Sequence, residues 1–254
     1  MGHDADAAVR RDFLALKLTQ ISKSFPADGG SRRVLDRLDL CVEDGEFVAV
    51  LGQSGCGKST LLRIAGGFEP SDSGSVLLGN TPVVSPSRKM IMLFQDFNQL
   101  FPWMTLQQNL LFALRKTAPN IGKEQALQLA RACLEQTGLG DSAGCYPYQL
   151  SGGMKQRGAL ARALALSPKV LLMDEPFSSL DYLTRRNAQD TLKKLWSQGG
   201  LTVLFITHDI GEVLLLAQRI AVFDLPSRRI GHIFPNDGTV PDLKARLEEL
   251  LRVE

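Results

Sequence analysis

Residues 46–60 read EFVAVLGQSGCGKST, and this stretch decides the fold. The first six residues are mostly apolar and are followed by a glycine, which predicts a short buried strand. The next nine fit the pattern G-x-x-x-x-G-K-S/T, and a helix is predicted from Lys58 to about Ala65. A strand, a glycine-rich loop and a helix in this order are typical of nucleotide-binding α/β proteins.

The glycine-rich loop has the chemistry of a phosphate site. Glycines allow backbone N–H groups to turn inward toward phosphate oxygens, and the following helix adds the positive end of its dipole. Lys58 can reach the β- and γ-phosphates, and Ser59 can place its hydroxyl on Mg²⁺. An accidental glycine-rich turn would match the pattern in roughly one chain in a hundred of this length. The predicted nucleotide-binding residues of the loop are Gly52, Gln53, Ser54, Gly55, Cys56, Gly57, Lys58, Ser59 and Thr60.

The rest of the chain alternates in a way that predicts a largely parallel α/β core. Between residues 95 and 165 the pattern is helical, so a helical lobe at about 96–165 is predicted between core strands. Residues 1–12 are polar and lack the apolar segment of a signal peptide, so we expect a flexible tail. A final amphipathic helix is expected to open at Pro241. The predicted strands are residues 14–18, 34–42, 46–51, 76–78, 90–94, 170–173, 203–207 and 220–223.

A second motif, VLLMDE at residues 170–175, ends in two acidic residues and completes the predicted site. A buried strand carries Asp174 to its carboxyl end, where α/β folds place their ligands. Asp174 suits support of Mg²⁺, and Glu175 could polarise an attacking water. The alternative is a pair of solvated acidic residues without a role.

Composition excludes several classes of protein. The net charge of +2 gives no sign of a nucleic-acid footprint, and no apolar run is long enough to span a membrane. The four cysteines contain no CxxC pair and are interpreted as reduced thiols. A GTPase is disfavoured because the sequence contains no NKxD motif.

Residues 150–157, LSGGMKQR, resemble the signature sequence of ABC ATPases and lie just before VLLMDE, as in that family. Ser151 can cap a helix, and Gly152 and Gly153 can expose backbone N–H groups at its positive end. In the family this end faces the γ-phosphate bound by the other subunit of a dimer. An isolated SGG would be better explained as an ordinary capped helix.

Other family elements follow in the same order. Gln95 resembles the glutamine that senses Mg²⁺, water and the transmembrane partner, and Asp181 ends a segment, SSLD, that resembles the D-loop. His208 in ITHD resembles the switch histidine that contacts the γ-phosphate, although a lone histidine after a strand is usually structural. Phe25 lies where the family has an aromatic residue stacked on adenine, with a core phenylalanine as the alternative.

The resemblance implies a P-loop NTPase core with an antiparallel β subdomain and an inserted helical lobe, as one ABC ATPase domain over residues 13–254. It implies ATP and Mg²⁺ as cofactors, with Glu175, His208 and Gln95 as catalytic residues. The implied partners are permease subunits, a second copy bound head to tail and, indirectly, a solute-binding protein, with no nucleic acid. The implied location is the cytoplasmic face of the bacterial inner membrane, as a peripheral subunit. The implied metal ligands are Ser59, Gln95 and Asp174.

Residues 95–109, QDFNQLFPWMTLQQN, resemble the nitrate, sulfonate and taurine importer group. In the family this stretch receives a short cytoplasmic helix of the permease, so Phe101 and Trp103 either dock the permease or pack inside the lobe. A small anion such as nitrate or a sulfonate is therefore the expected cargo. The alternatives are an ABC ATPase of another transporter subfamily, a non-transport ABC ATPase acting on nucleic acid or ribosomes, and a nucleotide switch without turnover. Gly158 departs from the family pattern and is expected to lower helix stability by up to about 1 kcal/mol.

Overall fold

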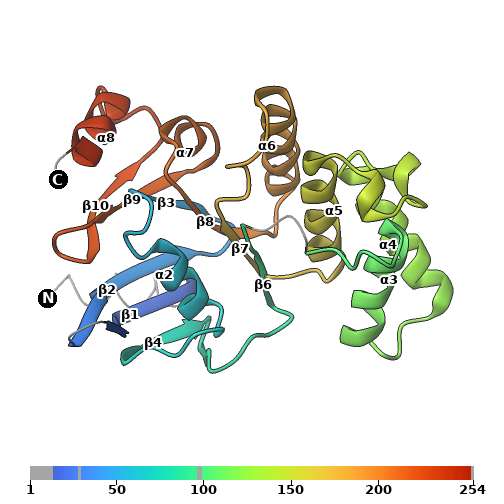
Figure 1. The fold of residues 1–254 in the computed structure, drawn as a ribbon, viewed down its shortest axis with the longest axis horizontal. Coiled ribbons are helices and arrows are strands. Elements are labelled where there is room, and N and C mark those ends of the chain that lie inside the picture. The colour runs from blue at the N-terminus through green and yellow to red at the C-terminus, as the bar shows by residue number, and fades with distance from the viewer. Residues whose placement is uncertain (1–13, 28–29, 96–98, 253–254) are drawn as a thin grey trace, which may run out of the picture. The chain divides into compact units, whose positions relative to one another are not determined.

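The computed structural model describes residues 14–27, 30–95 and 99–252 (Figure 1). The chain forms two compact units. The first combines Met1–Ser87 with Gly200–Glu254, and the second is Arg88–Gly199. The tail expected at residues 1–12 lies outside the described residues.

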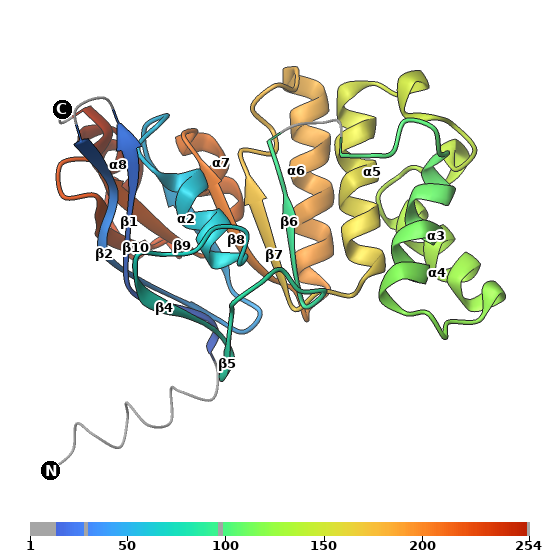
Figure 2. The same ribbon diagram turned by 60° about the horizontal axis from the view of Figure 1, so that its bottom comes forward.

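An antiparallel sheet forms one part of the first unit, and its strand order is β2-β1-β4-β5. Alternate residues of β2 are buried, among them Leu38, Leu40 and Val42, so one face of the sheet lies on the core. Leu18 pairs with Leu40 and Leu16 with Val42 across the β1–β2 ladder. Figure 2 shows β1, β2 and β4 running side by side. The strands are β1 Leu14–Ala27, β2 Gly30–Glu43, β4 Ser73–Leu78 and β5 Thr81–Pro82.

A second set of strands in the first unit holds the glycine-rich loop. Strand β3, Phe47–Leu51, is wholly buried and pairs in parallel with both β8 and β9. Burial on both faces explains why these strands are continuous apolar runs. Strand β10 pairs antiparallel with β9 and is mostly exposed. The remaining elements are β8 Thr202–Thr207, β9 Arg219–Asp224, β10 Arg229–Pro235, α2 Lys58–Ala65, α7 Ile210–Leu216 and α8 Leu243–Arg252.

The second unit contains two parallel strands and four α-helices among its described residues. Helices α3, α4 and α5 pack against one another around a buried, leucine-rich core (Figure 2). Thr105 begins α3 with a complete capping box, since its side chain accepts from the amide of Gln108 and the Gln108 side chain accepts from the Thr105 amide. The elements are β6 Met90–Leu93, β7 Val170–Asp174, α3 Leu106–Thr117, α4 Lys123–Gln136, α5 Gly152–Ala165 and α6 Tyr182–Ser197, with short 3-10 helices at Gly140–Ser142 and Pro147–Gln149.

These elements confirm the predicted α/β class, and they correct some details. The first strand extends from Leu14 to Ala27, and β5 and β10 were not predicted. Strand β10 is an exposed strand that contains a glycine and a proline, so it lacks a strong apolar pattern. The last helix begins at Leu243 and not at Pro241, because Asp242 has a φ of 48° that lies outside the helical region. The boundaries predicted for the helical lobe stay a prediction.

Gly158 has a packing role that sequence reasoning missed. A Cβ at this position would lie 2.8 Å from Leu106 Cδ2 and 3.2 Å from Leu100 Cδ1. Both leucines are buried, at 0% and 3% exposure, so neither can move aside freely. The glycine allows α5 to approach these side chains closely, which offsets its unfavourable helix propensity.

We expect Gly158→Ala to lower the free energy of unfolding by about 1 kcal/mol, because overpacking outweighs the gain in helix propensity. Urea unfolding of the variant and the native chain would measure the change. Ala132→Gly on the exposed face of α4 provides the control for propensity alone, with an expected loss of about 1 kcal/mol. A Gly158→Ala variant more stable than the native chain would contradict the packing explanation.

Candidate nucleotide site

The glycine-rich loop joins the carboxyl end of β3 to the N-terminus of α2. Gly55 and Gly57 have φ angles of 77° and 122°, which residues with a Cβ rarely adopt. Gly57 is also close to its neighbours, since a Cβ there would lie 2.9 Å from Val34 Cγ1. A Cβ on Gly52 would lie 3.0 Å from Phe223 Cβ. The spacing of glycines in the motif therefore follows from backbone conformation and from close packing against β2 and β9.

Lys58 is the charged centre of the loop and is only 4% exposed. Its Nζ donates hydrogen bonds to the carbonyl oxygens of Gly52, at 2.8 Å, and Gln53, at 2.7 Å. Nζ also lies 4.0 Å from Cys56 Sγ. Burial raises the pKa of the Cys56 thiol, although the positive charge of Lys58 opposes this effect. The loop thus holds an ammonium in place beside a thiol that stays protonated at neutral pH.

His208 follows directly after β8, and its side chain is exposed. The turn that carries it is built by its neighbours. Asp209 caps α7 by accepting from the amides of Gly211, at 2.7 Å, and Glu212, at 3.2 Å. The buried Thr207 hydroxyl donates to Glu212 Oε2 at 2.7 Å. Sequence reasoning missed Glu212, although an Asp followed three residues later by a Glu is a known signal of a helix start.

Phe25 is half-buried near the end of β1, where it pairs with Arg32 of β2. The ammonium of Lys23 lies 5.2 Å from the centroid of its ring. The same ammonium forms an ion pair of 2.6 Å with Glu69 and a hydrogen bond of 2.7 Å to the carbonyl of Pro70. The strand that carries Phe25 is therefore tied to the segment that follows α2.

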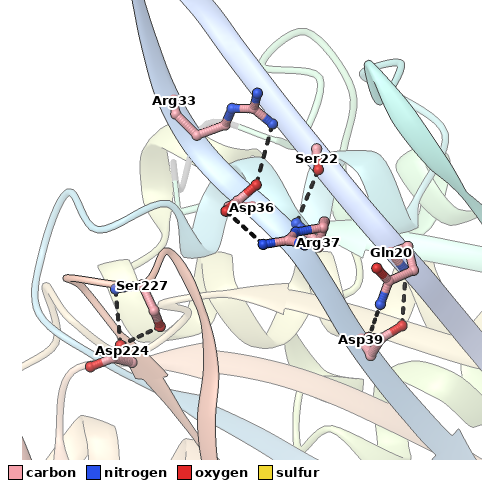
Figure 3. A network of polar contacts seen from close by, with 8 residues as sticks. All are labelled: Gln20, Ser22, Arg33, Asp36, Arg37, Asp39, Asp224 and Ser227. Atoms are coloured by element: carbon pink, nitrogen blue, oxygen red, sulfur yellow. Dashed lines mark hydrogen bonds and ion pairs between the residues drawn. The ribbon is translucent and has the colours of Figure 1, made fainter.

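A polar hollow of about 670 Å³ on the first unit is lined by residues of β1, β2 and the β9–β10 hairpin. Its carboxylates are hydrogen-bonded to close neighbours (Figure 3). Asp39 accepts from the amide of Gln20 at 2.8 Å and from its side chain, and Asp224 accepts from the amide of Ser227 at 2.9 Å. These groups stabilise the strands and the turn, and no predicted site residue lines the hollow.

The second unit carries the acidic motif at the end of β7. Asp174 is the last residue of the strand and is 4% exposed, and Glu175 is half-buried. Glu175 has a φ of 42°, which is unusual for a residue with a Cβ and typical of strained functional positions. The Ser178 hydroxyl donates to the carbonyl of Glu175 at 3.0 Å. The sequence did not predict this left-handed turn, which changes the direction of the chain at Glu175.

The LSGG segment begins α5 as expected. Ser151 is exposed and caps the helix by accepting from the amide of Met154 at 3.3 Å. Gly153 is buried against Thr184 of α6, which leaves no room for a Cβ. Asp181 caps α6 by accepting from the amide of Thr184 at 3.1 Å. Hydrogen bonds from the side chain and the amide of Thr184 lower the pKa of Asp181, so the cap stays ionised at neutral pH.

Gln95 is exposed and immediately precedes residues 96–98, which the structure does not describe. Beside it, the Gln99 side chain accepts from the amide of Phe94 at 3.2 Å and donates to its carbonyl at 2.9 Å. Gln99 thereby bonds to the backbone of the residue before Gln95, a contact that sequence reasoning missed. Within the described ranges, no group of three or more His, Cys, Asp or Glu residues could hold a metal by itself.

A family model described as ABC transporter matches residues 35–178. The chain is 44% identical over 216 residues to a protein of Brucella abortus biovar 1 (strain 9-941) described as ATP-binding, covering 85% of this chain and 82% of the relative. The chain belongs to the ABC transporter family.

Further ABC proteins are similar over most of their length. A nitrate import ATP-binding protein of Synechococcus elongatus is 40% identical over 214 residues, covering 84% of this chain and 78% of the relative. A bicarbonate transport ATP-binding protein of Synechocystis sp. is 39% identical over 235 residues, covering 92% of this chain and 83% of the relative. A solved dimeric ATP-binding cassette, bound to ADP and phosphate in a post-hydrolysis state, superimposes with a TM-score of 0.76 at 31% identity, covering 88% of this chain and 99% of that one.

The family and the fold class predicted from the sequence are thus confirmed. The predicted site residues of this ABC protein fall into two groups. The loop of residues 52–60, Phe25 and His208 belong to the first unit, and Gln95, residues 151–153, Asp174, Glu175 and Asp181 belong to the second. Their individual roles stay predictions.

We expect Lys58→Ala to weaken ATP binding by about tenfold to a hundredfold, because a charge-assisted hydrogen bond contributes about 1.5–3 kcal/mol. Titration with a fluorescent ATP analogue would measure the affinity. Lys244→Ala on the exposed face of α8 is the matched control, with no expected change. Normal affinity in the Lys58 variant would show that the loop does not bind phosphate as predicted.

Proposed function

We propose that the chain is the ATP-binding and ATP-hydrolysing subunit of an ABC importer for a small anion. The observation that carries this proposal is the phosphate loop, with Lys58 held at its centre, in a chain of the ABC transporter family. The names of the nitrate and bicarbonate relatives support the small anion. The relatives named for a role concern transport, and no observation favours action on nucleic acid or ribosomes.

Two copies would bind ATP between them, head to tail. The similar solved cassettes are dimeric, which supports this arrangement. The exposed Ser151 and Gly152, at the positive end of α5, would face the γ-phosphate held by the loop of the other copy. An isolated copy would then lack half of the groups around the γ-phosphate and hydrolyse ATP slowly.

The roles of the side chains follow from their chemistry. Glu175 would orient and activate the attacking water, and His208 would contact the γ-phosphate. Ser59, Asp174 and Gln95 offer hard oxygen donors, which fit Mg²⁺. When bound, Mg²⁺ would neutralise charge on the phosphate oxygens.

Glu175→Gln is the experiment that tests the proposal. The substitution keeps the shape of the side chain but removes its charge and most of its basicity, so ATP binding should persist while hydrolysis slows by about a hundredfold or more. Unhydrolysed ATP should then trap the dimer. Size-exclusion chromatography with Mg-ATP should show twice the monomer mass.

Adding Ser151→Arg to this variant should block the dimer, because a bulky side chain would obstruct the phosphate of the opposite copy. The native chain without nucleotide provides a monomeric reference. A Glu175→Gln variant that hydrolyses ATP at the native rate would contradict the catalytic role. A double variant that still dimerises would contradict the head-to-tail site.

The permease would dock on the segment that begins at Phe101. Trp103 is 69% exposed, so the alternative in which it packs inside the lobe is wrong. Phe101 is half-buried, with its ring 5.5 Å from that of Trp103 and 5.1 Å from that of Phe112. Phe101 therefore packs against Phe112 on one side and contacts the exposed indole of Trp103.

A buried side chain holds this segment in place. Asn109 is 0% exposed; its Oδ1 accepts from the amide of Phe101 at 2.7 Å, and its Nδ2 donates to the carbonyls of Phe101, Met104 and Thr105 at 3.0–3.2 Å. Next to the segment lies a cavity of about 300 Å³, lined mainly by apolar side chains and by Arg162. A preformed exposed aromatic beside an apolar cavity suits a short helix of a partner.

We expect Trp103→Ala to weaken assembly with the permease by about 2–4 kcal/mol, as for an aromatic at the centre of an interface. Co-purification with co-expressed permease subunits would measure it. ATP binding should be unchanged, and stability should fall by less than the roughly 3–5 kcal/mol of a buried aromatic. Phe68→Ala, an exposed aromatic of the first unit, is the control. Normal assembly by the Trp103 variant would contradict the docking role.

The proposed location is the cytoplasmic face of the bacterial inner membrane, as a peripheral subunit held by the permease. Across residues 14–27, 30–95 and 99–252, no helix is both long and apolar enough to cross a membrane. The solute-binding protein would contact the complex through the permease.

A further inference from the structure

The C-terminal helix α8, drawn in red in Figure 1, contacts the phosphate loop directly. Gln53 Nε2 donates a hydrogen bond to the carbonyl oxygen of Leu251 at 2.9 Å, although the two residues are 198 positions apart in the chain. Leu251 lies in the last turn of α8, where carbonyl groups have no partner within the helix and carry the negative end of its dipole. This carbonyl is therefore a good acceptor for a side-chain amide.

Gln53 also holds the phosphate-binding lysine. Its own carbonyl oxygen accepts from Lys58 Nζ at 2.7 Å. One residue thus bonds to α8 through its side chain and to the Lys58 ammonium through its backbone. A displacement of the end of α8 would move Gln53 and, with it, one of the two carbonyls that position Lys58.

Helix α8 is itself fixed to the first unit. Leu247 is 0% exposed, and the guanidinium of Arg246 lies 5.7 Å from the centroid of the Phe234 ring in β10. Lys244 and Glu248 form an exposed ion pair on the surface of the helix. The helix is therefore a stable support for Gln53, and the exposed Lys244 side chain offers a position for a control substitution.

The loop and the helix do not pack solidly where they meet. A cavity of about 230 Å³ lies beside the contact, lined by residues that include Gln53, Phe223, Leu250 and Leu251. Fewer van der Waals contacts hold the two segments together next to a cavity. The hydrogen bond from Gln53 links the two segments directly beside this cavity.

We infer that α8 is a positioning element of the nucleotide site, which acts through Gln53 to hold Lys58 in its phosphate-binding place. The inference rests on the proposed nucleotide site and adds α8 to the elements that position it. Neither Leu251 nor α8 contributes a side chain to the phosphates. The effect is transmitted through the Gln53 side chain.

A double-mutant cycle tests this inference. Gln53→Met keeps the length of the side chain and removes its donor. A chain that ends at Glu249 removes the Leu251 carbonyl and retains the buried Leu247. Each change should weaken binding of a fluorescent ATP analogue by about three- to tenfold, as for one hydrogen bond. The combination should be no weaker than either change alone, because both break the same link.

Lys244→Ala is the control within α8, with unchanged affinity and a melting temperature close to that of the native chain. Hydrogen exchange at the amides of residues 53–57 should quicken in both test variants. Unchanged affinity in Gln53→Met, or losses that add in the double variant, would overturn the inference. If the shortened chain does not fold, the affinity of Gln53→Met and its hydrogen exchange at residues 53–57 decide the question together, and unchanged exchange would overturn the inference. Failure of the native chain to bind ATP would overturn the proposed function instead.

Discussion

The structure of the nucleotide site depends on one buried ammonium. Lys58 is 4% exposed, and a charge in such a place is stable only if polar groups surround it. The carbonyls of Gly52 and Gln53 provide two of those groups, so the loop must fold back over its own lysine. This return path requires the positive φ angles of Gly55 and Gly57.

The surrounding elements can be understood as supports for that loop. Strand β3 is wholly buried and leads into the loop, and β2 and β9 approach so closely that a Cβ would lie 2.9 Å from Val34 at Gly57 and 3.0 Å from Phe223 at Gly52. Helix α8 reaches the loop from the other end of the chain through Gln53. The loop is therefore held by segments from several parts of the sequence, which makes its conformation a property of the whole first unit.

In the second unit, the functional candidates lie where elements begin or end. Ser151 and Asp181 begin α5 and α6 as caps, and Asp174 ends β7. Glu175 then departs from the strand in a left-handed conformation, which costs energy and is a type of strain often found at functional sites. Short polar side chains at such termini satisfy the backbone and remain available to a ligand.

The sequence by itself determined the phosphate loop, the buried parallel strands and the capped LSGG helix, because these depend on local patterns of glycine, apolar runs and capping residues. It left open whether Trp103 is buried, and it misjudged Gly158 as merely unfavourable for a helix. Only the tertiary structure decided these points and placed Leu251 beside Gln53, since each depends on how side chains pack and not on the local pattern, as Leu106 against Gly158 shows. Local sequence patterns indicate the conformation that a residue prefers, whereas tertiary packing determines which residues it contacts.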